Sequence, residues 1–328
     1  MSSQLTPQLS FDLFQPERGH KFAEGIKTFH EFGQNTREIV TASKTFEGAL
    51  ISVPTFVNEF WTSKQRAASR LHEISYRACF KPQLPRFFIE RLTAPGEIVY
   101  DPFMGRGTSL VEAALLGRVS FGCDINPLSV LLTKPRLNPP TLEQIAIRLG
   151  EIDFGDHDEW PEELLVFFHP ATLKQIVALK KYLLCRSAEG KLDPVDDWIR
   201  MVAINRLTGH SPGFFSVYTL PPNQSVSIKS QQKINLDRNQ TPPERNVAAI
   251  ILKKSRILLS DCDAKIRLGL ARNFQRALLV TQLASNTPQI PDHSVALAVT
   301  SPPFLDIVDY AGDNWLRCWF AGIDANSV

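Results

Sequence analysis

The chain has 328 residues, 43% of them hydrophobic and 21% charged, and its net charge at pH 7 is +2. These values are ordinary for a globular protein and allow one large domain or two smaller ones. Because the net charge is so small, binding to nucleic acid would have to come from local basic patches. No apolar stretch reaches membrane-spanning length, and the polar start MSSQLTPQLS lacks the layout of a signal peptide, so we expect no membrane partner.

Cysteine and histidine are spread thinly along the chain. No CxxC pair occurs among the five cysteines, and no two of the seven histidines stand at the spacing of metal ligands. Scattered cysteines are typical of reduced thiols in the cytoplasm rather than of a disulfide framework or a zinc site. We therefore expect a cytoplasmic protein without a metal site.

The first part of the chain predicts a βαβ unit. Residues 1–60 show no clear period and are expected to wrap the surface. A helix is predicted over 84–92, followed by a strand over 97–101, a glycine-containing loop, a helix over 108–116 and a strand over 119–124. This order is typical of a parallel sheet covered by helices.

The second part predicts a helical insertion and then a return to the sheet. Apolar residues at helical spacing predict four helices, over 141–149, 171–184, 195–207 and 247–258. Strand character returns at 277–281 and 295–300. We therefore predict an α/β fold with a mostly parallel, Rossmann-like sheet interrupted by a helical insertion.

The loop in VYDPFMGRGTSLVEA has the glycine spacing GxG between a strand and a helix. A ligand-free turn would have a similar sequence, because glycine also permits a tight turn by itself. Leu110 occupies the place of the third glycine of a dinucleotide site, and the GK[ST] of a P-loop is absent. Asp124 ends the next strand, where its carboxylate could bind two ribose hydroxyls or simply cap a helix. Loop and acid together favour a ligand that contains adenosine but no pyrophosphate.

The stretch TSPPF, residues 300–304, follows an apolar run that predicts a buried strand. A Pro-Pro pair cannot continue a central strand, because proline fixes φ and donates no backbone hydrogen bond. Residues 301–304 are therefore expected to form a rigid elbow at the strand end. A simple strand terminator is the alternative interpretation.

These stretches resemble one enzyme family. DPFMGRGTSL followed by GCDINP resembles the S-adenosylmethionine-binding motif of class I methyltransferases. TSPPF resembles the catalytic tetrapeptide of DNA methyltransferases that methylate amino groups, and residues 72–103 resemble the segment before the glycine loop in that family. The similarity covers roughly residues 70–135 and 290–322.

The resemblance implies a class I methyltransferase fold, S-adenosylmethionine as cofactor and double-stranded DNA as substrate. It implies a cofactor site lined by Asp101, Phe103, Gly105, Gly107 and Asp124, with Asp124 on the ribose. It implies a target-base site formed by Ser301, Pro302, Pro303 and Phe304. Phe304 replaces the more usual Tyr, and Gln282 and Ala296 stand where the family often has acids.

Together with the predicted elements, the resemblance suggests a division of the chain into four parts. Residues 1–60 would wrap the surface, 61–135 would bind the cofactor, 136–270 would be a basic insertion for target recognition, and 271–328 would be catalytic. Basic residues gather at 223–256, and at 60–88 they interleave with aromatic rings. We expect both stretches to face the DNA, with a solvated basic face as the alternative.

An elbow of this kind suits chemistry on an exocyclic amine, whose lone pair is delocalised into the base. The Ser301 hydroxyl and the Pro302 carbonyl can accept hydrogen bonds from the amine and free that lone pair. Phe304 offers a face on which the flipped base can stack. The chain has no Pro-Cys dipeptide of the kind that cytosine-C5 enzymes use for their nucleophile.

Several functions stay open at this point. Ser before Pro-Pro favours cytosine N4 over adenine N6 as the methyl acceptor. An incomplete or inactive chain that binds DNA or a partner subunit is a second hypothesis, and an RNA or protein methyltransferase is a third. A restriction endonuclease partner would fit the first hypothesis.

The strand before the elbow is expected to have an unpaired edge. Only one amphipathic helix is predicted after the elbow, so no later segment supplies the further strands that the family has. An uncovered apolar edge is a liability that proteins normally cover. The sequence therefore predicts a truncated product, or half of an enzyme that a second polypeptide completes.

Overall fold

A parallel sheet of four strands lies at the centre of the α/β part of the molecule. The computed structural model describes residues 16–45, 48–62, 68–77, 79–155, 159–221, 225–303 and 309–325. Within these residues the strand order is β5-β4-β3-β6 and neighbouring strands run parallel. The strands are β3 (Ile98–Asp101), β4 (Val119–Asp124), β5 (Leu278–Thr281) and β6 (Val295–Ala298). The predicted α/β fold with a parallel sheet is confirmed.

Four helices pack around this sheet. The predicted βαβ unit is confirmed, with α3 connecting β3 to β4 and packing on both. The sequence pattern does not predict α4 or α10; α4 is apolar on several sides and contains Pro135, so it lacks a clean helical period. The helices are α2 (Gln83–Leu92), α3 (Thr108–Leu115), α4 (Pro127–Leu137) and α10 (Ala264–Phe274).

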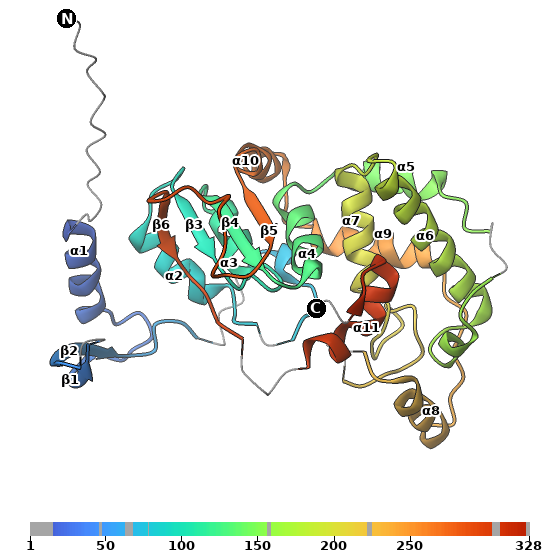
Figure 1. The fold of residues 1–328 in the computed structure, drawn as a ribbon, viewed down its shortest axis with the longest axis horizontal. Coiled ribbons are helices and arrows are strands. Elements are labelled where there is room, and N and C mark those ends of the chain that lie inside the picture. The colour runs from blue at the N-terminus through green and yellow to red at the C-terminus, as the bar shows by residue number, and fades with distance from the viewer. Residues whose placement is uncertain are drawn as a thin grey trace, which may run out of the picture.

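The middle of the chain forms a helical half beside the sheet (Figure 1). The four predicted helices correspond to α5 (Leu142–Glu151), α6 (Pro170–Ala188), α7 (Pro194–Ile204) and α9 (Val247–Leu258). The amphipathic helix near the end of the chain is α11 (Tyr310–Ala321), which packs on α7, α4 and α6. Trp198 of α7 is fully buried, and its indole N–H donates to the Ser255 hydroxyl of α9. The remaining elements are η1 (Arg70–His72), η2 (Glu162–Val166) and α8 (Ile228–Asp237).

The N-terminal part of the described chain contains regular elements that its pattern does not predict. Helix α1 (Pro16–Lys27) packs on α2, and β1 (Arg37–Lys44) pairs antiparallel with β2 (Leu50–Val57). This hairpin forms a sheet of its own, separate from the four-stranded sheet.

Aromatic rings hold this part to the sheet half. Phe87 lies at the centre of a cluster in which its ring centroid is 5.3–6.3 Å from those of its neighbours, which are Phe22, Phe29, Phe60, Trp61 and Phe88. Phe60, Trp61, Phe87 and Phe88, which belong to the stretch expected to face the DNA, are members of this cluster. They make contacts with one another, because a ring gains more from burial in a cluster than from exposure.

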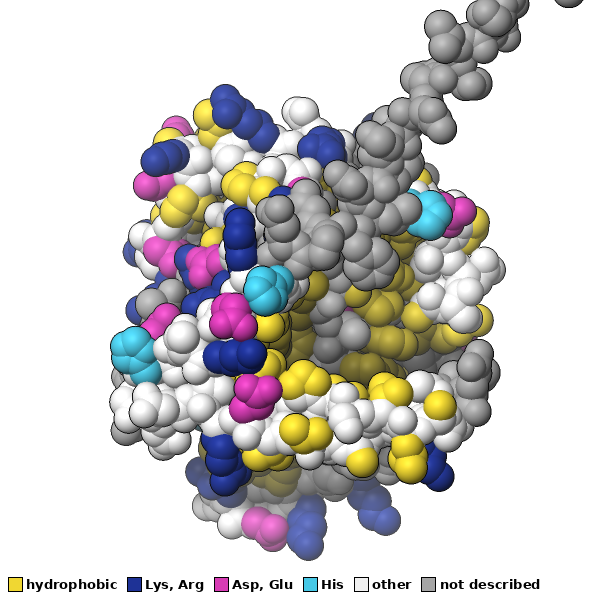
Figure 2. Space-filling view, turned by 90° about the vertical axis from the view of Figure 1, so that its left-hand side faces the viewer, with side chains coloured by type: hydrophobic (Ala, Val, Ile, Leu, Met, Phe, Trp, Pro, Cys, Tyr) yellow, Lys and Arg dark blue, Asp and Glu magenta, His cyan; other side chains and the backbone are white. Residues whose placement is uncertain are grey.

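The hairpin is exposed on both faces. Its exposed apolar side chains include Ile39, Val40, Leu50, Ile51, Val53 and Val57. Figure 2 views this end of the molecule and shows hydrophobic side chains scattered along its lower rim and lining a hollow above it. A two-stranded hairpin gains little stability alone in water, so contacts at its base carry most of its support; the Asn58 side chain there donates to the Phe29 and Gln34 carbonyls.

Strand β6 lies at one edge of the sheet, as expected. It pairs with β3 on one side, and no other strand of the described residues pairs with its free side. No helix in the described part of the chain is long and apolar enough to cross a membrane.

Candidate functional site

A cavity of about 350 Å³ opens at the carboxyl ends of β3, β4 and β5. Ligands of open α/β sheets bind at this edge, just beyond the strand ends. Six of the nine predicted site residues line the cavity: Asp101, Phe103, Gly105, Asp124, Ser301 and Pro303. Gly107 and Pro302 do not line it, and Phe304 lies outside the described residues. Asp101 and Ser301, which are 200 residues apart in sequence, thus meet at one cavity.

The two glycines of the loop act differently. Gly107 begins α3 with a φ of +75°, and a Cβ there would lie 2.3 Å from Thr133 Oγ1 of α4. Its role is therefore close packing and a left-handed turn. Gly105 has a φ of +48° and lines the cavity, and its amide donates to Asp124 Oδ2 at 2.7 Å.

Asp124 is held at the end of β4 by two backbone amides. Besides Gly105, the amide of Asn126 donates to its other oxygen, Oδ1, at 2.9 Å. Burial raises the pKa of Asp124, although these hydrogen bonds oppose the rise. The carboxylate is thus oriented at the cavity by neutral donors, which leaves its remaining lone pairs able to accept from hydroxyls of a ligand.

Asp101 connects the glycine loop to the elbow. One oxygen accepts from the amide of Phe103 and from the Thr300 hydroxyl, the latter at 2.7 Å, and the other accepts from Ser109 of α3 at 2.8 Å. Burial raises the pKa of Asp101, and the same hydrogen bonds oppose the rise. The sequence does not predict a role for Ser109 or Thr300. Their only distinguishing feature is a hydroxyl group next to the glycine loop and the elbow, respectively.

The elbow leaves the sheet in a defined direction. The amide of Val299 donates to the Tyr100 carbonyl, and Ser109 also donates to the Val299 carbonyl, so β6 stays attached to β3 up to the elbow. Ser301 follows, is half-buried, and lines the cavity together with the exposed Pro303. The hydroxyl predicted to act on a substrate therefore lies at the cavity wall.

Apolar side chains form part of the cavity wall. Phe103, Ile125 and Leu283 rank among the exposed large hydrophobic residues of the described chain, at 37%, 55% and 59%, and all three line the cavity. Each stands one or two residues after its strand, β3, β4 or β5. Exposed apolar side chains that line a cavity can pack against a flat aromatic ring of a ligand. The signal for Ile125 and Leu283 was their position just past a strand end.

Two arginines, the fully buried Arg136 and the half-buried Arg106, fix the segment that carries Tyr76 over the glycine loop. Arg106 donates to the carbonyls of His72 and Ile74, and Arg136 donates to the carbonyl of Leu71. Burial lowers the pKa of both guanidinium groups, that of Arg136 to about 9. Because the segment is fixed in this way, Tyr76 lines the cavity opposite Gly105.

One buried acceptor in the cavity wall has no protein donor. Gln282 lines the cavity, and its side-chain oxygen accepts no hydrogen bond within the described residues. A buried acceptor without a partner is costly unless a ligand or water satisfies it. In the sequence, Gln282 stands out only because the resembling family often has an acid at this position.

Part of the chain is similar in sequence to known DNA methyltransferases. Residues 49–134 match the DNA methylase family model, whose members methylate amino groups. The Type II methyltransferase M.MvaI of Kocuria varians is 31% identical over 34% of this chain, and M.MjaII of Methanocaldococcus jannaschii is 34% identical over 25%. M.BsoBI of Geobacillus stearothermophilus is 23% identical over 88% of the chain. Residues 49–134 are therefore similar to the amino-methylating DNA methyltransferases.

These matches cover only part of the relatives. The chain spans 24%, 16% and 58% of the lengths of M.MvaI, M.MjaII and M.BsoBI. No solved structure was found to match the chain.

The cavity fits the cofactor of this family, S-adenosylmethionine. Asp124 offers a carboxylate for ribose hydroxyls, the apolar side chains offer contacts for an adenine ring, and Gln282 offers an unpaired acceptor. The cavity also falls in the size range of small-molecule sites. Among the described residues, no group of His, Cys, Asp and Glu side chains could hold a metal ion.

Proposed function

We propose that this chain transfers a methyl group from S-adenosylmethionine to an exocyclic amino group in double-stranded DNA, with cytosine N4 as the acceptor. The observation that carries the proposal is the shared cavity, in which Asp124 and the glycine loop face the Ser301 elbow. Direct methyl transfer requires the cofactor and the target base to lie next to each other. Residues predicted for the cofactor site and residues predicted for the target-base site line this one cavity.

The cofactor would bind along the ends of three strands. Asp124 would accept from the ribose hydroxyls, and Gln282 would accept from the adenine amino group. Phe103, Ile125 and Leu283 would contact the adenine ring, while the bare backbone of Gly105 leaves room for the cofactor. Gln282 would then replace the acid that relatives often carry, with a neutral acceptor on the same amino group.

Bound there, S-adenosylmethionine supplies an electrophilic methyl group on a positively charged sulfur. The Ser301 hydroxyl and the Pro302 carbonyl would each accept a hydrogen bond from the target amine, which draws its lone pair out of conjugation. That lone pair would form the new bond to the methyl carbon as the bond between sulfur and methyl breaks. The sulfur would keep the electron pair of the broken bond and leave as a neutral thioether, and the proton that the amine loses would go to water. Phe304 would stack on the flipped base.

Asp101 would act as a positioning residue for this step. Its bond to Thr300 fixes the residue directly before Ser301, and its bond to Ser109 fixes the helix that follows the glycine loop. One carboxylate therefore sets the distance between the loop that binds the donor and the elbow that binds the acceptor.

We further propose that residues 61–135 and 271–328 form the catalytic part, that 136–270 recognise the DNA target, that 1–60 are peripheral and that the protein acts in the cytoplasm. A paired restriction endonuclease would account for the similarity to Type II methyltransferases.

The test is a transfer assay with methyl-labelled S-adenosylmethionine on duplex DNA, RNA and protein. Digestion of the DNA to nucleosides then separates N4-methylcytosine from N6-methyladenine. Ser301→Ala should slow transfer roughly a hundredfold with unchanged cofactor affinity. The control is Ser285→Ala, an exposed serine after β5 that does not line the cavity. Equal rates for both variants would reduce the elbow to a strand terminator.

The free edge of β6 favours a second candidate, a chain that works with another polypeptide. A strand supplied by that polypeptide would pair with β6 and complete the sheet, and the isolated chain would be weakly active and prone to associate. Light scattering on the purified chain, with the transfer assay beside it, separates the two. A monodisperse monomer with full activity would exclude the need for a second polypeptide.

A further inference from the structure

Helix α8 exposes one face that is both basic and apolar. Lys229, Gln232, Lys233 and Leu236 are all exposed, and their spacing of three, one and three residues places them on one side of the helix. Leu236 is 81% exposed, more than any other large hydrophobic residue in the described part of the chain. Leu236 follows Lys233 by three residues, so this face carries an exposed apolar side chain beside two lysines.

The opposite face of α8 is held by amide hydrogen bonds. The buried Gln231 donates to the Tyr218 carbonyl at 3.0 Å and to the Asn235 side chain at 2.8 Å. Asn235 in turn donates to the Val166 carbonyl, and Gln240 donates to Tyr218 and Asn235. These directional contacts fix the rotation of the helix about its axis, so the exposed face is presented in one orientation.

Two further contacts fix its ends. The Ser227 hydroxyl accepts from the amide of Ser230 and caps the start of the helix. At the other end, the Arg238 guanidinium lies 3.9 Å from the centre of the Tyr218 ring. Arg238 thus lies on the side of the helix that carries Gln231, and the only acid of α8 is Asp237.

The position of α8 relates it to the cavity. In Figure 1 the strands end toward the lower side of the molecule, and α8 projects on that side, at the far end from the hairpin. Duplex DNA that delivers a base to the elbow must lie along this side. Charge complementarity favours it as the occupant, because each phosphate is an anion and α8 offers lysines there.

We propose that the exposed face of α8 enters the major groove of the DNA that the cavity methylates. Lys229 and Lys233 contact phosphates, Gln232 reads an adenine edge, and Leu236 contacts a thymine methyl group. The ten residues of α8 span about 15 Å, enough to lie within the groove. The inference rests on the proposed methyl transfer to DNA and identifies the element that selects the site.

Other basic elements of the insertion suit this role less well. Helix α9 buries Val247, Ile251 and Leu258 in the core. Its Lys254 is half-buried near Glu73, and burial lowers the pKa of this lysine to about 8. The basic stretch 223–256 is thus divided, with α8 exposed and most of α9 committed to packing.

The first experiment measures binding of a random-sequence duplex pool by anisotropy as salt is varied. Replacing Lys229 and Lys233 by Ala should lower the slope of log affinity against log salt by about two units, because each phosphate contact releases close to one counterion. The matched control replaces Lys265 and Arg272, two exposed cations of α10 on the amino-end side of the sheet. The control should keep the parent slope.

The second experiment maps methylated sites on genomic DNA by sequencing. Gln232→Ala should relax the preference at one base pair by roughly tenfold, with the rate at the best site little changed. Gln289→Ala, an exposed glutamine before β6, is the control.

The outcomes distinguish this inference from the proposed function. If the parent chain methylates DNA while the α8 variants keep its salt slope and its sites, α8 is a solvated face and the inference is wrong. If the parent chain neither binds nor methylates DNA, the proposed function fails and the inference fails with it. A reduced slope together with a changed site preference supports both.

Discussion

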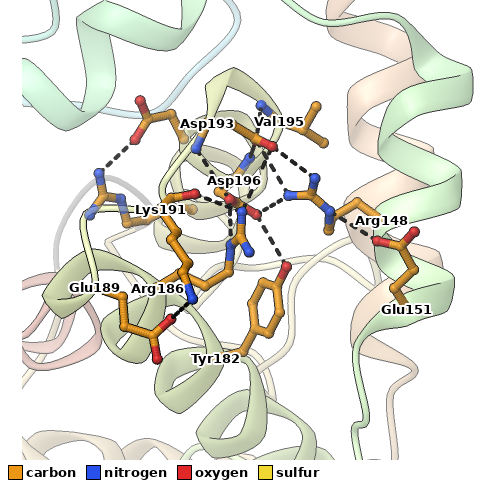
Figure 3. Close-up of polar contacts among 11 residues, drawn as sticks. Arg148, Glu151, Tyr182, Arg186, Glu189, Lys191, Asp193, Val195 and Asp196 are labelled. Carbon is orange, nitrogen blue, oxygen red and sulfur yellow. Dashed lines mark hydrogen bonds and ion pairs between the residues drawn. The ribbon is translucent and has the colours of Figure 1, made fainter.

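Buried carboxylates behave in opposite ways in the two halves of the molecule. In the helical half, Asp196 is fully buried between two arginines, with Arg148 Nη1 at 2.5 Å and Arg186 Nε at 2.7 Å (Figure 3). In the sheet half, Asp101 and Asp124 accept only from backbone amides and hydroxyls in the described residues. The charge of Asp196 is compensated by two arginines. The carboxylates of Asp101 and Asp124 have only neutral donors among the described residues, and they lie beside the cavity.

The pKa directions follow from this difference. Burial alone would raise the pKa of Asp193, but hydrogen bonds from Arg148 and from the amides of Asp196 and Val195 outweigh it and lower the pKa. Burial raises the pKa of Asp101 and Asp124, because no cation compensates for the lost water. A buried acid without a cation is costly to the fold, and such acids are therefore good candidates for ligand binding.

The largest effect is expected where the helical network is broken. Arg148→Met removes one of the two arginines that contact the buried Asp196, and it removes the hydrogen bonds that Arg148 donates to Asp193. The free energy of unfolding should therefore fall by about 3 kcal/mol. Urea unfolding measures this loss. Cofactor affinity, measured by calorimetry at a temperature where the variant is folded, should stay at the parent value.

The next effect concerns the cavity. Asp124→Asn keeps the shape of the side chain but removes its charge, and should weaken S-adenosylmethionine binding by about 1–3 kcal/mol. Its free energy of unfolding should change little, because the removal of a buried uncompensated charge offsets the loss of the hydrogen bond that one of the two backbone amides donates. A variant that unfolds more easily and binds the cofactor normally would mean that Asp124 serves the fold.

The comparison also predicts opposite responses to pH. The raised folded-state pKa of Asp124 makes its contribution to stability greatest at low pH, and this contribution is lost as the pH rises from the ordinary aspartate value, near 3.9, through the raised pKa. The lowered pKa of Asp193 makes its contribution complete above the ordinary value, and it is lost as the pH falls through the folded pKa. Unfolding of Asp124→Asn and Asp193→Asn across acidic pH, each relative to the parent, should give differences of opposite sign.

Acid should also weaken cofactor binding. Ribose hydroxyls donate to an ionised Asp124, so affinity should begin to fall at a pH above the ordinary aspartate range. In Asp124→Asn the affinity should be flat over that interval, which calorimetry at several pH values can measure.

The smallest effect is expected for an exposed ion pair of the helical half. Lys191 lies 2.9 Å from Glu189, and both side chains are more than half exposed. Lys191→Ala should change the free energy of unfolding by less than about 0.5 kcal/mol, because water screens the pair. The same measurement serves as the control for Arg148→Met.

Much of the fold follows from local patterns. Strands β3 and β4 and helices α3, α5, α6, α7 and α9 lie close to their predicted positions, since apolar periodicity and turn residues mark each of them. The β1–β2 hairpin, α4 and α8 were not predicted. Helix α8 has no apolar stripe, so its sequence shows no helical period. It is held instead by the buried Gln231, whose side-chain amide donates a hydrogen bond to the Tyr218 carbonyl.

The sequence by itself determined the chemistry available to this protein: a glycine loop, an acid at a strand end and a hydroxyl before two prolines. Those motifs are local, and short-range sterics and hydrogen bonding fix their backbone. Only the tertiary structure decided that Asp101 ties the loop to the elbow, that Gly107 packs against α4, and that the rings around Phe87 form a small core. These outcomes depend on which distant residues meet, because burial and pairing across the sheet assign each side chain its partner.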